Sequence, residues 1–199
     1  PYLENGYYYY VRYKNKKEYP IYCRKYKNLD NDEEIILDVN VLAEGHDYFA
    51  IGSMSISPDN KWLAYGVDTL SRRFYKVHFK NLISGENLEH TISNTTGGVA
   101  WANDNETVFY TSKNKVTLLG EKIYRHKLAT HSDQDQLVYH EKDETYYNGV
   151  YRSKSGQYII IYNSSTLVSD YHILDANEPD GKFINFSPRG KKHEYDIQH

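Results

Sequence analysis

Cysteine is almost absent from this chain: Cys23 is the single one among 199 residues. A lone thiol cannot build the internal disulfide framework that stabilises many small extracellular domains. The chain also lacks the paired cysteines of a structural zinc site. The cysteine content therefore favours a reducing compartment, and we predict a cytoplasmic protein.

An excess of one charge and long apolar runs are also lacking. The 24 basic and 27 acidic residues give a net charge of −3, and no basic stripe stands out among them. That distribution argues against binding to nucleic acid. No apolar run approaches the ~20 residues needed to span a membrane. No charged segment followed by a short apolar one marks a signal peptide within the chain. We expect neither nucleic acid nor a membrane among the partners.

Recognisable catalytic and ligand-binding motifs are missing as well. The chain has no Gly-x-Ser-x-Gly nucleophile elbow, no His-Glu-x-x-His pair and no phosphate-binding glycine loop. Two acidic runs, 30–34 and 141–144, fall between expected strands, and we predict that they are solvated loops. We therefore predict no cofactor, no metal site and no catalytic residue in this chain.

Nine histidines are scattered along the chain. Three of them, His78, His126 and His172, fall in the third expected strand of successive repeats. This pattern favours a repeated structural position over a metal site.

What the chain does contain is a recurring unit of strand, tight turn and strand. In residues 55–65 the turn is Pro58-Asp59-Asn60. Proline presets its φ angle, and Asp and Asn side chains bond their own backbone and tolerate the left-handed conformation. The apolar run that begins at Trp62 then starts the second strand.

The same unit recurs twice. It appears 45 residues later at 101–110, where Asp104 and Asn105 take the turn positions, and a further 51 residues later at 152–161, where Gly156 holds the turn. Such a period, with only strand signals inside it, is typical of β-propeller blades. Chance is the alternative, because strand-turn-strand units are common, but three copies in phase favour a propeller.

We predict an all-β fold, part of a seven-bladed β-propeller made of four-stranded antiparallel blades, with about three to four blades present. The blade signals cover 7–38, 50–92, 97–140 and 148–187, with 193–199 as the start of a further blade. The expected strands include 88–92, 99–102 and 182–186. Residues 1–6 are predicted to be a lead-in, and 39–44 a helical turn capped by Asp38. Too few blades are present to close a ring, so we interpret 1–199 as a partial N-terminal propeller domain.

Strand direction divides the expected loops between two faces. In a four-stranded antiparallel blade with strands A to D, the A–B and C–D connections share one face, and the B–C and D–A connections share the other. The second set is longer and richer in charged and aromatic residues, and recognition is usually carried by such loops on a rigid scaffold. Our candidate residues on that face are Arg72, Arg73, Thr96, His46 and Asp47. The alternative is that they are ordinary solvated loop residues.

Short stretches along nearly the whole chain match a known family in the same order. They are Asn5-Gly6-Tyr7-Tyr8-Tyr9-Tyr10-Val11-Arg12-Tyr13, Lys17-Glu18-Tyr19-Pro20-Ile21-Tyr22-Cys23-Arg24, Leu37-Asp38-Val39-Asn40, Ala43-Glu44-Gly45-His46, Ser57-Pro58-Asp59-Asn60, Ala64-Tyr65 with Asp68, Ser71-Arg72-Arg73, Val99-Ala100-Trp101-Ala102, Tyr124-Arg125-His126-Lys127-Leu128, Glu141-Lys142-Asp143-Glu144 and Leu174-Asp175-Ala176. Through these residues the chain resembles the prolyl oligopeptidase family of serine peptidases, in particular its oligopeptidase B (protease II) branch.

The resemblance implies a larger parent protein. Family members join a seven-bladed N-terminal propeller to a C-terminal α/β-hydrolase domain, and the propeller restricts the active site to short peptides. The oligopeptidase B branch cleaves after Lys or Arg. The catalytic Ser, Asp and His lie in the hydrolase domain, which is absent from this segment. The implied partners are that domain and short peptide substrates, and the implied function of the chain is that of a substrate-filtering propeller without its own triad.

The resemblance also bears on the candidate residues. Propeller loops that help to shape the substrate site in prolyl oligopeptidases match this chain at Arg73 and at Thr96. Arg and Thr replace the acidic and aromatic groups expected in the prolyl branch. Contact between the two domains is therefore the expected role of Arg72 and Arg73.

Two other functions remain as alternatives. A non-catalytic propeller scaffold for protein–protein interaction would repeat further blades, but the Gly-His and Trp-Asp signature of the common scaffold repeat is missing. A sugar-cleaving propeller would need inward carboxylates on its first strands. Those strands read Met54-Ser55-Ile56, Val99-Ala100-Trp101 and Val150-Tyr151-Arg152, without a carboxylate.

Overall fold

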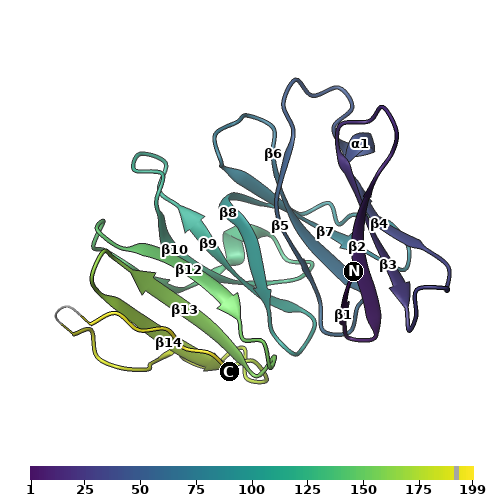
Figure 1. Cartoon of the computed structure of the whole chain (residues 1–199). Coiled ribbons are helices and arrows are strands. Elements are labelled where there is room, and N and C mark those ends of the chain that lie inside the picture. The colour runs from purple at the N-terminus through teal and green to yellow at the C-terminus, as the bar shows by residue number, and fades with distance from the viewer. Residues whose placement is uncertain (191–192) are drawn as a thin grey trace.

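Four-stranded antiparallel blades follow one another along the chain, as expected for part of a β-propeller. The computed structural model describes residues 1–190 and 193–199. The first blade consists of β1 (Tyr2–Glu4), β2 (Tyr7–Tyr13), β3 (Pro20–Tyr26) and β4 (Glu34–Asp38), paired in that order. Figure 1 shows the blades arranged side by side along an arc.

The first strand of this blade corrects the expectation that residues 1–6 are only a lead-in. Strands β1 and β2 form a hairpin in which Tyr2 pairs with Tyr9. Asn5 and Gly6 make its turn, with φ angles of 46° and 81°. An Asn-Gly pair suits such a tight turn because both positions need a positive φ.

A short helix connects the first two blades. Helix α1 (Val39–Leu42) begins at Asp38, whose carboxylate accepts a hydrogen bond from the backbone N–H of Asn40. The predicted capped helical turn after β4 is therefore confirmed.

The second and third blades share one strand. Strands β5 (Ala50–Ile56), β6 (Trp62–Asp68), β7 (Tyr75–Asn81), β8 (Ile92–Trp101), β9 (Thr107–Lys113), β10 (Gly120–Lys127) and β11 (Gln136–His140) form one seven-stranded sheet. Strand β8 pairs with β7 through Ile92 and Thr95 and with β9 through Val99–Trp101. It serves as the last strand of one blade and the first strand of the next.

This continuity corrects the expected strand at 88–92. This stretch meets β7 at separate points: the Asn81 N–H donates to the Glu86 carbonyl, the Leu88 N–H donates to the Phe79 carbonyl, and Asn87 forms an isolated bridge with Lys80. The strand begins at Ile92 and passes from one blade to the next because Thr95 pairs with neighbours on both sides, Tyr75 and Ser112, with register shifts between Tyr75 and Val77 and between Thr95 and Val99.

The fourth blade consists of β12 (Tyr147–Arg152), β13 (Tyr158–Ser164), β14 (Ser169–Asp175) and the short β15 (Ile184–Asn185). Strand β15 is shorter than the expected 182–186. Residues 193–199 form no strand, contrary to expectation. A strand needs a neighbour to complete its ladder, whereas this segment bonds to the fourth blade mainly around two serines: Ser155 bonds to His199, and Ser169 bonds to His193 and Tyr195.

The turn chemistry found in the sequence is confirmed. Asn60, Asn105 and Gly156 occupy equivalent turns between first and second strands, with φ angles of 63°, 62° and 74°. The turns also contact one another, because the backbone N–H of Asp59 donates to the side-chain carbonyl of Asn105 at 2.8 Å. These repeats therefore position neighbouring blades as well as their own strands.

The apolar core lies between adjacent blades. Leu37, Val39, Phe49, Leu63 and Tyr65 form the cluster between the first and second blades. Val77, Phe79, Ile92, Trp101 and Val108 form the next cluster, and Phe109, Ile123, Ile159, Ile161 and Leu174 form the third. Each blade is thus stabilised mainly by the faces of its neighbours, as in other repeat folds.

Helical structure is sparse in the described residues. None of their helices is both long and apolar enough to cross a membrane.

Candidate functional site

The register of the strands places all the candidate residues on one face. Ala50 pairs with Asp68 at one end of the β5–β6 pair, and Ile56 pairs with Leu63 at the other end. The loop before β5 and the loop after β6 therefore share a face, called the B–C/D–A face below. The loops that follow β2, β6 and β9 all project on this side of the arc (Figure 1).

The β6–β7 loop is folded around a buried carboxylate. Asp68 is only 1% exposed. Its two oxygens accept backbone hydrogen bonds from Leu70 at 2.8 Å and from Arg73 at 2.7 Å. Ser71 and Arg73 take positive φ angles of 58° and 56° to close the loop. As a result Arg72 and Arg73 are both exposed on the B–C/D–A face.

Lys113 joins this loop to the next blade. Its ammonium Nζ donates a hydrogen bond to the backbone carbonyl of Arg73 at 3.1 Å and lies 5.4 Å from the ring centre of Phe74. Partial burial and the neighbouring positive charge of Arg73 lower the pKa of Lys113. The sequence analysis did not single out Lys113, although it ends the second strand of its blade at the position that Asp68 holds in the preceding one.

Thr96 lies beside a tyrosine held between glycines. A Cβ atom on Gly52 or on Gly97 would come within 2.8 Å of the ring of Tyr75, so neither position has room for a side chain. The Thr95 hydroxyl donates to the Tyr75 carbonyl and accepts from the Gly97 N–H. This packing fixes the backbone on both sides of Thr96, whose own side chain is exposed.

His46 and Asp47 are exposed in the connection between β4 and β5. The His46 ring lies 5.6 Å from the ring of Phe49. Within the described residues, neither side chain forms a hydrogen bond or ion pair with Arg72, Arg73 or Thr96. The structure therefore joins Arg73 to Lys113 by a hydrogen bond, whereas His46 and Asp47 are on the same face without such a bond to the other candidates in the described residues.

A cavity of about 1380 Å³ lies against the first strands of all four blades. It is bordered by Glu4 of β1, Ser53 of β5, Thr96 of β8, and Asn148 and Arg152 of β12. Thr96 thus reaches both this cavity and the B–C/D–A face, which makes it the candidate residue closest to the inner side of the blades.

A buried polar cluster lies where the third and fourth blades meet. Glu141 and Asp170 are 9% and 1% exposed, and one guanidinium group bridges them. Arg189 donates from Nη2 to Glu141 at 2.5 Å, donates from Nε to Asp170, and stacks 3.8 Å from the ring centre of Tyr146. Burial opposes the charge of Arg189, but the hydrogen bonds to the two carboxylates outweigh it and raise the pKa of Arg189.

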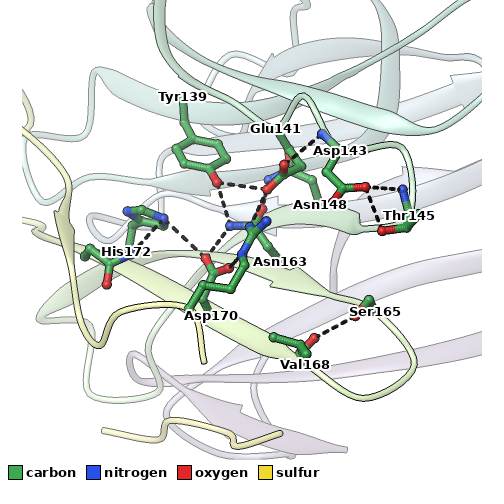
Figure 2. Close-up of polar contacts among 12 residues, drawn as sticks. Tyr139, Glu141, Asp143, Thr145, Asn148, Asn163, Ser165, Val168, Asp170 and His172 are labelled. Atoms are coloured by element: carbon green, nitrogen blue, oxygen red, sulfur yellow. Dashed lines mark hydrogen bonds and ion pairs between the residues drawn. The ribbon is translucent and has the colours of Figure 1, made fainter. Parts of the chain in front are cut away.

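Amide and phenol groups complete this cluster, as Figure 2 shows. The side-chain amide of Asn163 donates to Asp170 at 2.7 Å and to the Tyr139 hydroxyl at 2.8 Å. Asn148 in turn donates to Asn163 at 2.7 Å. Burial and the nearby carboxylate of Glu141 raise the pKa of Tyr139, so this phenol stays protonated. The cluster therefore connects groups from the third and fourth blades.

The cluster corrects part of the prediction for the acidic run 141–144. Lys142, Asp143 and Glu144 are exposed, as expected for a solvated loop, but Glu141 is buried and paired. The sequence gives no separate signal for this pairing, because the partner Arg189 lies 48 residues further along the chain.

The expected common position of three histidines is only partly right. His78 pairs with Tyr65 and His172 with Ile161, and these partners are equivalent positions of their blades. His126 instead pairs with Val108, two residues away from the equivalent register position. Its ring is buried and lies 2.6 Å from the carboxylate of Asp135.

Within residues 1–190 and 193–199, no group of three or more His, Cys, Asp or Glu side chains is placed to hold a metal ion.

Consecutive four-stranded blades with cores between them define a segment of a β-propeller, here with a face of charged loops. The whole chain, residues 1–199, matches the family described as the N-terminal β-propeller domain of prolyl oligopeptidase, and it belongs to that family. The resemblance noted in the sequence is thereby confirmed.

Two curated relatives are similar over the whole chain. It is 37% identical to dipeptidyl aminopeptidase BI of Pseudoxanthomonas mexicana and 30% identical to protease 2 of Moraxella lacunata, and in both cases the match covers 100% of this chain and 30% of the relative. The chain therefore spans about a third of the length of these relatives.

Solved structures agree with the fold. Oligopeptidase B from Leishmania major superimposes with a TM-score of 0.93 at 27% identity, over 100% of this chain and 29% of that one. Oligopeptidase B from Trypanosoma brucei, in a closed form with covalently bound antipain, superimposes with a TM-score of 0.90 at 28% identity. The match covers 100% of this chain and 28% of that one.

Proposed function

We propose that this chain is the substrate-filtering propeller of a serine oligopeptidase that hydrolyses short peptides after Lys or Arg. The proposal rests on one observation, the match of residues 1–199 to the propeller family of prolyl oligopeptidase. The relatives named protease 2 and oligopeptidase B support the choice of branch. The lone thiol of Cys23 supports a reducing, cytoplasmic location.

The catalytic chemistry would belong to a hydrolase domain outside residues 1–199. There a serine would attack the peptide carbonyl, a histidine would carry the proton, an aspartate would orient the histidine, and backbone donors would hold the oxyanion. The propeller would contribute a restricted entrance. Its loops on the B–C/D–A face, including Arg72 and Arg73, would face the hydrolase domain, with Thr96 nearer the substrate path.

A second specificity is supported by the name of one relative. Dipeptidyl aminopeptidase BI is 37% identical to this chain over the 30% of its length that matches, and its name describes removal of dipeptides from a free amino terminus. The two specificities differ in whether the substrate needs a free α-amino group. A propeller scaffold without catalysis is the remaining alternative.

The test uses the natural protein that contains this chain. Its reading frame beyond His199 is sequenced for a Gly-x-Ser-x-Gly motif followed by Asp and His. The protein is then assayed with two peptides of the same length that contain one internal Arg, one with a blocked and one with a free amino terminus. Cleavage of the blocked peptide after Arg supports the oligopeptidase. Release of dipeptides from the free peptide alone supports the aminopeptidase.

A third outcome would reject both specificities. If the reading frame contains only further blades and neither peptide is cleaved, the chain is a scaffold propeller.

A further inference from the structure

Three successive blades carry basic residues in the same loop. The B–C loops of the first three blades present Lys14, Lys16 and Lys17, then Arg72 and Arg73, then Lys113 and Lys115. We call these seven residues the basic arc. All of them are exposed except Lys113, which is half-buried. The arc is a local feature, because the chain as a whole carries a net charge of −3.

The arc is held in place by its supporting residues. Lys113 bonds to the carbonyl of Arg73 at 3.1 Å, which joins the second and third loops. The first loop is anchored at Tyr19, whose backbone N–H donates to the Asn40 side chain at 3.0 Å and whose carbonyl accepts from the same side chain at 2.9 Å. The three loops project on the same side of the molecule (Figure 1).

The charges of the arc are not neutralised within the part of the chain that the structure describes. None of the seven residues takes part in an ion pair there, whereas other basic residues do, such as Arg12 with Glu33 and Arg24 with Glu34. Asp68 is the buried carboxylate beside the second loop, and backbone hydrogen bonds occupy both its oxygens. Glu18 is the exposed carboxylate within the first loop.

The loops at the other ends of the blades have the opposite composition. The C–D connections, 27–33, 82–91, 128–135 and 176–183, contain Lys27 and Lys182 as their only Lys or Arg residues. Their exposed carboxylates are Asp30, Asp32, Glu33, Glu86, Glu89, Asp133, Glu178 and Asp180. The C–D loops are therefore mainly acidic, and the B–C loops present a run of cations without ion-pair partners in the described residues, although the D–A connections on the same face also carry the exposed carboxylates of Glu44, Asp47, Asp143 and Glu144.

We propose that the basic arc docks against an acidic surface of the catalytic domain and closes the enzyme electrostatically. This inference rests on the proposed function, because it needs a hydrolase domain on the B–C/D–A face. The occupant follows from charge complementarity and from the length of the relatives, about two thirds of which lies outside the matched region. Exposed charges interact over a screening length of ~10 Å at 0.1 M salt and over less at higher salt. Closure should therefore weaken as salt increases.

The test measures access to the active site of the natural full-length protein. A small organophosphonate that labels the catalytic serine is added at NaCl concentrations from low to high, and the labelling rate is recorded. Arg72→Glu with Lys115→Glu reverses two charges of the arc. Neither side chain makes a hydrogen bond or ion pair within the described residues, so folding should be unaffected, and the melting temperature verifies this.

The matched control reverses two charges on the other face, Lys27→Glu with Lys182→Glu. It produces the same change in net charge without touching the arc. In the unmodified protein and in the control, labelling should be slow at low salt and faster at high salt. In the arc variant, labelling at low salt should be faster by roughly threefold or more, since a surface charge pair is worth up to about 1 kcal/mol, or about a fivefold change in an equilibrium constant, and two charges are reversed. Its salt dependence should be lost.

Three results would decide against the inference in separable ways. If the arc variant and the unmodified protein show equal salt dependence, the proposed role of the basic arc is rejected and the proposed function is unaffected. If the arc variant and the control change the labelling rate equally, only net charge matters, and the proposed role of the basic arc is again rejected. No labelling or hydrolysis by the unmodified protein at any salt concentration rejects the proposed function, and the inference with it.

Discussion

The ammonium group of Lys113 lies 3.1 Å from the backbone carbonyl oxygen of Arg73, so one hydrogen bond joins loops of two adjacent blades. Lys113→Met should remove this bond while keeping a side chain of similar length over Phe74. We expect a loss of about 1 kcal/mol or less in unfolding free energy, because the group is only partly buried. Amide hydrogen exchange at residues 69–74 should become faster. Lys115→Met is the control, and equal exchange in both variants would contradict the role of Lys113.

Asp68 should matter more than the loop residues it supports. Asp68→Ala removes the acceptor of two backbone hydrogen bonds and leaves the Leu70 and Arg73 N–H groups without it. The expected loss is about 2 kcal/mol of unfolding free energy. Asp68→Asn keeps one acceptor oxygen and should lose less. Denaturant unfolding of both variants measures the difference, and an Asn variant as unstable as the Ala variant would argue for a charge effect instead.

Arg189 should be more costly to remove than its partly exposed position implies. Arg189→Gln leaves Glu141 and Asp170 buried without their shared cation. Breaking a buried ion pair from one side typically costs about 3–5 kcal/mol, and the 32% exposure of the Arg189 side chain should bring the loss below that range. A double variant that adds Asp170→Asn should recover part of the stability. If the losses in unfolding free energy from Arg189→Gln and Asp170→Asn simply add in a double-mutant cycle, Arg189 and Asp170 are not coupled.

Gly97 and Gly85 provide a matched pair for testing the packing around Tyr75. Both have positive φ angles, 97° and 79°. A Cβ at Gly97 would lie 2.8 Å from the Tyr75 ring, whereas a Cβ at Gly85 would meet nothing within 4 Å. Gly85→Ala should therefore lose about 1 kcal/mol from backbone strain alone. Gly97→Ala should lose at least 2 kcal/mol more through the clash. Thermal unfolding compares them, and equal losses would show that Tyr75 moves aside.

The lowered pKa of Glu33 should make the protein lose stability in acid. Hydrogen bonds from Arg12 and Tyr10 lower the pKa of Glu33 to about 2. A carboxylate whose pKa is lower in the folded state stabilises the protein above its ordinary pKa, and this contribution disappears as the pH falls toward 2. Glu33→Gln should therefore reduce stability at pH 6 but lose less than the unmodified protein between pH 5 and pH 2. Urea unfolding measures the unfolding free energy of both proteins from about pH 5 to pH 2. An equal decrease in the Glu33→Gln variant and in the unmodified protein would contradict the prediction.

The repeat was predictable because its turns need particular residues. Asn60, Asn105 and Gly156 are residue types that tolerate a positive φ, and their spacing alone predicts the blades. The helical cap at Asp38 was predictable for the same reason. The strand at Tyr2–Glu4 was missed although Asn5-Gly6 is a hairpin signal, because a three-residue strand has too short a pattern to recognise.

The continuous strand β8 and the buried cluster were not predictable in the same way. Nothing in 92–101 by itself shows that Thr95 would bond to strands on both sides. The burial of Glu141 depends on Arg189, and a pairing between distant residues leaves no local pattern. The candidate face was found from strand direction, whereas Lys113 was overlooked because a single basic residue at a strand end has no distinctive pattern.

Strand β8 has a mechanical consequence. Because its ten residues belong to both blades, separating the second and third blades would require breaking its pairing with β7 or with β9, including the pairing of Thr95 on both sides. The connection between β4 and β5 contains a short helix and a loop, and the connection between β11 and β12 is a loop. If the row of blades flexes and widens the cavity along its first strands, the second and third blades should move as one rigid body. The hinges should then lie at residues 39–49 and 141–146.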